Sequence, residues 1–139
     1  MRHLGLDIGD KRIGVAVSDS EQILASPLTT IIRNSDEQAI NAIVGLVNEY
    51  QIKKIIVGLP YSLSGNISNQ AIKVKLFVDK LIQFTETEIE FRDERLSTVA
   101  VERLFVEAGK KSQKRKEQRD AAAAAFILQG YLDSLKASS

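Results

Sequence analysis

The sequence has no cysteine and only one histidine, His3. Without cysteine the chain has no disulfide, no thiolate nucleophile and no cysteine-ligated zinc. One imidazole cannot build a histidine-based zinc site, and at the start of the first expected strand we expect the ring of His3 to be hydrogen-bonded or solvated. Any chemistry must therefore come from carboxylates, lysine or hydroxyl groups. A bound metal ion would be Mg²⁺ or Mn²⁺, because both prefer oxygen ligands.

Tryptophan is also absent, and aromatic residues make up only 6% of the chain. If the protein binds nucleic acid, we therefore expect it to recognise the backbone or the shape rather than to stack on bases. No apolar run approaches the roughly 20 residues of a membrane span, and the N-terminus lacks the apolar core of a secretory signal. We expect a cytoplasmic protein with no membrane partner. The 139 residues fit one domain, residues 1–139.

The net charge is only +1, yet one segment is strongly basic. Residues 109–119, GKKSQKRKEQR, contain six bases and the single acid Glu117. Such a run can be a solvated loop with no further role. Beside a carboxylate metal site, it would instead bind a polyphosphate backbone.

The hydrophobic pattern changes along the chain from strand to helix spacing. Alternation predicts three strands, over residues 2–7, 13–18 and 28–33, joined as an antiparallel meander. After a capping box at residues 35–38, the pattern predicts, in order, a helix to Tyr50, a buried strand over 53–60, a helix over 74–82, a strand over 88–95, a helix from Ser97 to Gly109 and a helix over 120–135. This order predicts an α/β fold, with one mixed five-stranded sheet of three antiparallel and then two parallel strands and helices on both faces.

Two acids stand where chemistry is plausible. Asp7 ends the first strand on the face of Gly5, and Gly9 and Gly14 are expected to leave space nearby. Asp120 is in register with the apolar stripe of the last helix, so it should point at the sheet rather than at water. The alternatives are a turn-forming role for Asp7 and an interaction of Asp120 with the helix dipole in the first turn.

The third acid is ambiguous from the pattern alone. Asp93 alternates in phase with Ile89 and Phe91, whereas Glu94 is in phase with Glu88 and Glu90. Periodicity leaves both candidates open. In addition, the loop over residues 58–70 offers hydroxyl and amide groups that can bind sugar or phosphate oxygens, although a plain polar loop explains them equally well.

Four motifs together resemble one known family. They are LGLDIGDKRIGVAVSD (4–19), IIVGLPYSLSGNISNQ (55–70), DERLST (93–98) and DAAAAAFILQGYL (120–132), and they cover nearly the whole chain. The chain resembles the YqgF-type proteins, described as pre-16S rRNA nucleases and as Holliday-junction-resolvase-like proteins. The resemblance implies a ribonuclease H-like fold and a nuclease that processes the 5′ end of precursor 16S rRNA, with Holliday-junction DNA as the alternative substrate. One departure is Arg119, where the family more often has an aliphatic residue.

The resemblance also implies a carboxylate triad, carried here by Asp7, Glu94 and Asp120. Three such groups repel one another unless cations neutralise them, and two Mg²⁺ or Mn²⁺ ions would promote phosphodiester hydrolysis. The residues that we expect to contact the nucleic acid are Lys11, Arg12, Ser62, Gln70, Arg95, Lys111, Lys114, Arg115 and Lys116.

Other interpretations stay open. The stretch LDIGDKRIG also resembles the first phosphate loop of actin-like ATPases and sugar kinases, but these enclose a nucleotide between two such domains, for which 139 residues leave little room. A nucleic-acid-binding module without catalysis is another alternative. The sequence decides neither between structured RNA and branched DNA nor between a monomer and a two-fold dimer.

Overall fold

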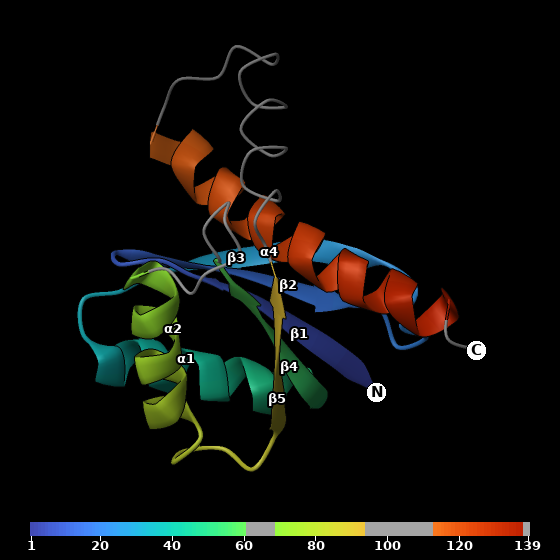
Figure 1. Ribbon diagram of the computed structural model, residues 1–139, viewed down its shortest axis with the longest axis horizontal. Helices are drawn as coiled ribbons and strands as arrows, with labels where there is room; N and C mark the ends of the chain where they lie inside the picture. The colour runs from blue at the N-terminus through green and yellow to red at the C-terminus, as the bar shows by residue number, and fades with distance from the viewer. Residues whose placement is uncertain (61–68, 94–112, 138–139) are drawn as a thin grey trace.

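A computed structural model describes residues 1–60, 69–93 and 113–137, and in the last range it describes the side chains of residues 118–136 (Figure 1). One sheet contains the strands β1 (Arg2–Ile8), β2 (Arg12–Ser18), β3 (Ala25–Ile32), β4 (Ile52–Leu59) and β5 (Glu88–Asp93), in the order β3-β2-β1-β4-β5. The pairs β1–β2 and β2–β3 are antiparallel, and β4 is parallel to both β1 and β5. The predicted mixed sheet is confirmed.

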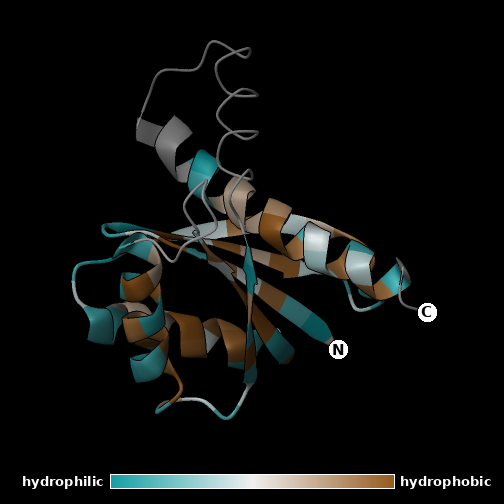
Figure 2. Cartoon of the chain, in the orientation of Figure 1, coloured by the Kyte–Doolittle hydropathy of each residue, from teal (hydrophilic) through white to brown (hydrophobic). Residues whose placement is uncertain are grey.

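Helices cover both faces of this sheet. Helices α1 (Asp36–Glu49) and α2 (Asn69–Leu81) lie on one face, and α4 (Gln113–Ala137) crosses the other (Figure 1). Figure 2 shows hydrophobic residues in brown along the central strands and along α1. No helix of the described residues is long and apolar enough to span a bilayer.

Each face of the sheet has its own core because side chains alternate along the strands. The larger core, between the sheet and helices α1 and α2, includes Leu4, Leu6, Val57, Ile43 and Phe77. The smaller core, beneath α4, includes Ala16, Ile56, Ala124, Ile127, Leu128 and Tyr131. The predicted apolar stripe of the last helix is therefore confirmed, and it is the stripe that docks α4 on the sheet.

The strand alternation predicted for β1 is also confirmed. Leu4 and Leu6 are buried in the larger core, whereas Gly5 faces α4. A Cβ atom at Gly5 would lie 2.8 Å from the Cβ of Leu128 and 2.9 Å from the carbonyl oxygen of Ala124. Residues of β1 in phase with Gly5, including Asp7, thus lie on the α4 face.

Several element boundaries differ from the prediction. Strand β3 begins at Ala25 and contains Pro27, which is tolerated because β3 is at the edge of the sheet. Helix α4 begins at Gln113, so residues 114–119 of the basic segment lie in a helix rather than in a loop. At the end of α2, Ile82 follows the helix and is 51% exposed. The helix predicted between Ser97 and Gly109 lies outside the described residues.

Candidate active site

Asp7 and Asp120 come together around a glycine of β2. Asp7 is paired with Gly14 in the β1–β2 ladder, and a Cβ atom at Gly14 would overlap the carbonyl oxygen of Asp120. The backbone of α4 therefore rests directly on β2, beside the strand position of Asp7. Two acids from opposite ends of the sequence thus adjoin the same residue, on the same face of the sheet.

The glycines around Asp7 do not leave open space, contrary to the prediction. The space above Gly14 is filled by the backbone of α4. A Cβ atom at Gly9 would lie 2.8 Å from the carbonyl oxygen of Arg12, which accepts a hydrogen bond from the N–H of Gly9. The absence of side chains at these positions allows a tight turn and a close helix rather than a cavity.

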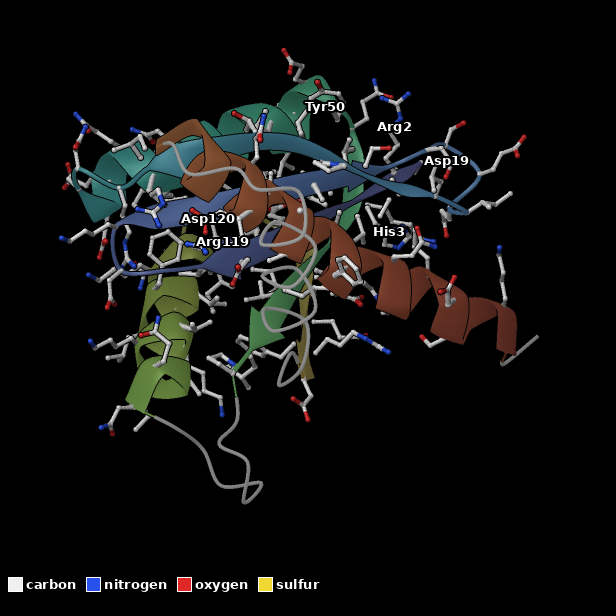
Figure 3. All side chains as sticks on the ribbon, turned by 90° about the horizontal axis from the view of Figure 1, so that it is seen from above. Arg2, His3, Asp19, Tyr50, Arg119 and Asp120 are labelled. Carbon is white, nitrogen blue, oxygen red and sulfur yellow. The ribbon has the colours of Figure 1, made fainter. Side chains whose placement is uncertain are left out.

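Asp120 lies two turns into α4, not in its first turn as the alternative interpretation required. The helix dipole acts only within the first turn, so it does not explain the presence of an acid at this position. The side chain is 21% exposed, and Figure 3 shows the residue where α4 crosses the strands. Its position on the sheet-facing side of the helix is the one predicted from the apolar stripe.

The carboxylate of Asp120 is paired with Arg12, the first residue of β2. The Nε of Arg12 donates to Oδ2 of Asp120 over 2.6 Å, and the Arg12 side chain is 25% exposed. Arg12 is in phase with Gly14 and therefore lies on the α4 face. The predicted contact of Arg12 with nucleic acid stays a prediction, and here its guanidinium contacts a candidate metal ligand.

The register of β5 places one of the two candidates for the third acid, Asp93. Asp93 is paired with Leu59, which is buried in the core beneath α1 and α2. Arg92 lies on the opposite face, because a Cβ atom at Gly130 of α4 would be 3.2 Å from its Nε. Since partners in register share a face, Asp93 is turned away from the side of Asp7. Glu94 lies outside the described residues.

The remaining predicted contacts are only partly described. Lys11 is exposed in the β1–β2 turn. Gln70 stands at the start of α2, and its Nε2 donates to the carbonyl oxygen of Ile8 over 3.4 Å, next to Asp7. Ser62, Arg95 and Lys111 lie outside the described residues, and Lys114, Arg115 and Lys116 lie in α4 without described side chains. Among the described residues, no three His, Cys, Asp or Glu side chains form a group that can hold a metal ion.

Sequence reasoning missed Arg33, which holds the turn that follows Asp7. Its Nη1 donates to the carbonyl oxygen of Gly9 over 2.7 Å, and its guanidinium lies 4.7 Å from the ring centre of Phe77 in α2. Arg33 also pairs with Asp36, and a hydrogen bond from Lys80 together with Arg33 lowers the pKa of that carboxyl group. Hydrophobic periodicity gives no information about a single arginine that follows a strand, so the sequence did not indicate this role of Arg33.

His3 is neither solvated nor fully hydrogen-bonded, so this expectation was wrong. It is 2% exposed, and its Nδ1 has no hydrogen-bond partner among the described residues. The ring packs at 5.5 Å against Tyr131 of α4, whose hydroxyl group accepts a hydrogen bond from Lys54. Burial first, and then the charge of Lys54, lowers the pKa of His3 below its ordinary value of 6.5. His3 belongs to the packing under α4, away from the acids.

Comparisons with known proteins agree over almost the whole chain. The family model described as "RuvX: Holliday junction resolvase" matches residues 1–134. A protein of Caldanaerobacter subterraneus subsp. tengcongensis is 45% identical over 139 residues, which are 99% of this chain and all of that protein. A protein of Roseiflexus sp. is 44% identical over 133 residues, 96% of this chain and 94% of that protein. Both are named "Putative pre-16S rRNA nuclease".

Solved structures confirm the ribonuclease H-like fold. The RuvC protein of T. thermophilus, in complex with a Holliday junction substrate, has a TM-score of 0.62 at 14% identity, with 98% of this chain and 96% of that chain covered. The fowlpox virus resolvase, in complex with Holliday junction DNA, has a TM-score of 0.60 at 13% identity, with 97% and 99% covered. The chain therefore shares its overall fold with these two proteins.

Proposed function

Since the chain belongs to the RuvX family, we propose that it is a metal-dependent endonuclease that hydrolyses phosphodiester bonds of structured nucleic acid. The observation that carries the proposal is the meeting of Asp7 and Asp120 at Gly14 on one face of the sheet. The family and the names of the relatives agree with this chemistry.

The substrate proposed first is precursor 16S rRNA, because relatives that match nearly the whole chain are named pre-16S rRNA nucleases. The cut is proposed at its 5′ end, as the family resemblance implies. Four-way DNA is the second candidate, favoured by the description of the family model. The sparse aromatic content fits recognition of backbone and shape in either case. A symmetric cut across a DNA junction would require a two-fold dimer, whereas RNA trimming can be done by a monomer.

Asp7, Asp120 and Glu94 are proposed as the metal ligands. Glu94 is chosen over Asp93 because Asp93 is in register with the buried Leu59, on the other face. The donor set fits a hard cation, since the described acids offer only oxygen atoms and the sole histidine is buried under the far half of α4. When bound, two Mg²⁺ or Mn²⁺ ions supply an activated water and stabilise the leaving oxygen.

The phosphate backbone is proposed to lie along the β1–β2 turn and the first turns of α4. Lys11 is exposed in that turn, close to the end of β1. The basic segment over 109–119 adds charge next to Asp120. Gln70 can offer an amide from the start of α2. Such contacts bind without reading sequence, and binding should therefore weaken steeply as salt rises.

A cleavage assay on both substrates tests the proposal. Labelled precursor rRNA and four-way DNA are incubated with Mg²⁺ or Mn²⁺ and with wild type, Asp7→Asn, Glu94→Gln or Asp120→Asn. Loss of an outer-shell partner of a metal ligand costs about 10- to 100-fold, so loss of a ligand should lower the rate at least about a hundredfold. Asp93→Asn is the matched control, because it removes a neighbouring acid on the opposite face.

The outcomes separate the interpretations. Full activity of Asp7→Asn or Asp120→Asn would place the catalytic site elsewhere. If wild type binds both nucleic acids but cuts neither with any divalent metal, the protein is a binding module. A loss of activity in Asp93→Asn with Glu94→Gln unaffected would reverse the choice of the third acid.

A further inference from the structure

The ion pair between Arg12 and Asp120 is built into the fold rather than formed by two flexible surface side chains. The N–H of Gly9 donates to the carbonyl oxygen of Arg12 over 2.9 Å, and the N–H of Arg33 donates to that of Lys11 over 2.8 Å. Arg12 is also paired with Ile32 of β3. With its backbone fixed on both sides, Arg12 presents its guanidinium to α4 from a defined position.

Asp120 is equally constrained. Its own carbonyl oxygen rests on Gly14, so α4 cannot shift toward the sheet, and the stripe below it is buried against Ala16 and Ile56. The two side chains meet at 2.6 Å and are 25% and 21% exposed. At this exposure, an ion pair is screened less by solvent than one on the open surface.

We propose that Arg12 is a resident cation on Asp120 that a divalent metal ion must displace, so that Arg12 sets the metal concentration at which the site fills. The inference rests on the proposed role of Asp120 as a metal ligand. The guanidinium offers only N–H donors and occupies Oδ2 of Asp120, so a metal ion can take that oxygen only when the Arg12 side chain moves away. Arg12 is thus a positioning residue that fixes the orientation of Asp120 and, in the metal-free protein, offsets negative charge beside Asp7.

Metal binding without nucleic acid tests the inference directly. The affinity for Mn²⁺ is measured by calorimetry and by the loss of the free-ion electron paramagnetic resonance signal, for wild type and for Arg12→Gln. Removing a competing ion pair of this kind should tighten binding roughly three- to tenfold. Arg12→Lys, which keeps the charge but not the planar donor, should fall between the two.

Lys11→Gln is the matched control because it removes the same charge from the adjacent residue, whose side chain is exposed. A charge in open solvent is screened, so this variant should change the affinity less than about twofold. The gain from Arg12→Gln should also disappear in the Asp120→Asn background, because the two residues act as a pair.

A measurement on the wild-type protein avoids dependence on a variant that folds poorly. The Nε–H proton of Arg12, assigned by comparison with Arg12→Lys, should give a protected signal in EDTA that is lost as Mg²⁺ saturates the site. An unchanged signal at saturation, or equal Mn²⁺ affinities for Arg12→Gln and Lys11→Gln, would overturn the inference and leave the nuclease proposal intact. Absence of any Mn²⁺ binding by wild type would overturn both.

Discussion

At the scale of single residues, the geometry of the candidate site depends on the absence of a side chain at Gly14. A side chain there would collide with the backbone of Asp120, so only glycine lets the helix bring its acid to the level of Asp7. The contact is with main-chain atoms, which cannot rotate away as the end of a flexible side chain can. The geometry of the two acids is therefore coupled to the packing of α4.

Gly14→Ala should lower the free energy of unfolding by about 1–3 kcal/mol, because overpacking against backbone forces the helix to shift. Chemical denaturation followed by circular dichroism measures the change. The control is Gly45→Ala in α1, where a Cβ atom meets nothing within 4 Å. That substitution should stabilise the protein by roughly 0.5–1 kcal/mol, because alanine is the better helix former. Effects of the same sign in both variants would contradict the role of Gly14.

The sequence could predict where two of the candidate acids lie more easily than what surrounds them. Strand alternation placed Asp7 on the face of Gly5, and the apolar stripe of the last helix placed Asp120 toward the sheet, as the structure has them. Periodicity left Asp93 and Glu94 both open, and the family resemblance implied Glu94. The register of β5 on β4, which no local pattern contains, places Asp93 alone. The contact of Arg12 with Asp120 was also hidden, because a basic residue beside a turn is equally consistent with exposure.

At the scale of elements, the start of a helix was predicted well where a capping residue marks it and poorly where no such residue does. Helix α1 begins after Ser35, as the capping box indicated. Helix α4 begins seven residues before Asp120 because the preceding lysine, arginine and glutamine residues are good helix formers, yet they carry no apolar period. The periodicity of apolar residues shows only the part of a helix that packs on the core, so it cannot detect turns that precede that part.

Ser35→Ala should destabilise the protein by about 1 kcal/mol. The Oγ of Ser35 accepts a hydrogen bond from the N–H of Gln38 over 3.2 Å, which satisfies one of the free donors at the start of α1. Ser35→Asp is the control, since a carboxylate can accept the same bond and favours the helix dipole. Thermal unfolding of the three proteins gives the comparison, and equal losses for alanine and aspartate would show that the cap does not act through this hydrogen bond.

At the scale of the whole molecule, four ionisable groups with altered pKa values lie at one end of the sheet, where β1, β4 and β5 begin and β2 ends. Lys54 of β4 is hydrogen-bonded to Glu88 of β5 and to Tyr131 of α4, and these two bonds raise the pKa of Lys54. The bond from Lys54 in turn lowers the pKa of Glu88. Backbone N–H groups of Ile23 and Leu24 lower the pKa of Asp19 in the loop after β2. The fold therefore prefers these groups charged and His3 neutral.

The free energy of unfolding should accordingly reach a plateau between about pH 6.5 and 10.5, the ordinary pKa values of histidine and lysine. The unfolded chain binds a proton at His3 more readily than the folded chain does, so stability falls as the pH drops below 6.5. The lowered pKa values of Glu88, Asp36 and Asp19 add a second loss as the pH falls below 4.5 and 3.8. The raised pKa of Lys54 gives the opposite sign, with a loss above 10.5.

His3→Leu separates the two acidic steps. Leucine fills the buried position without a polar nitrogen, so the decline just below pH 6.5 should disappear, while the carboxylate step and the alkaline loss remain. Removal of an unsatisfied buried nitrogen should also leave the plateau unchanged or raise it by about 1 kcal/mol. Urea unfolding across the pH range measures all three regions. A wild-type slope below pH 6.5 that persists in His3→Leu would mean that another group, and not the histidine under α4, takes up the proton on unfolding.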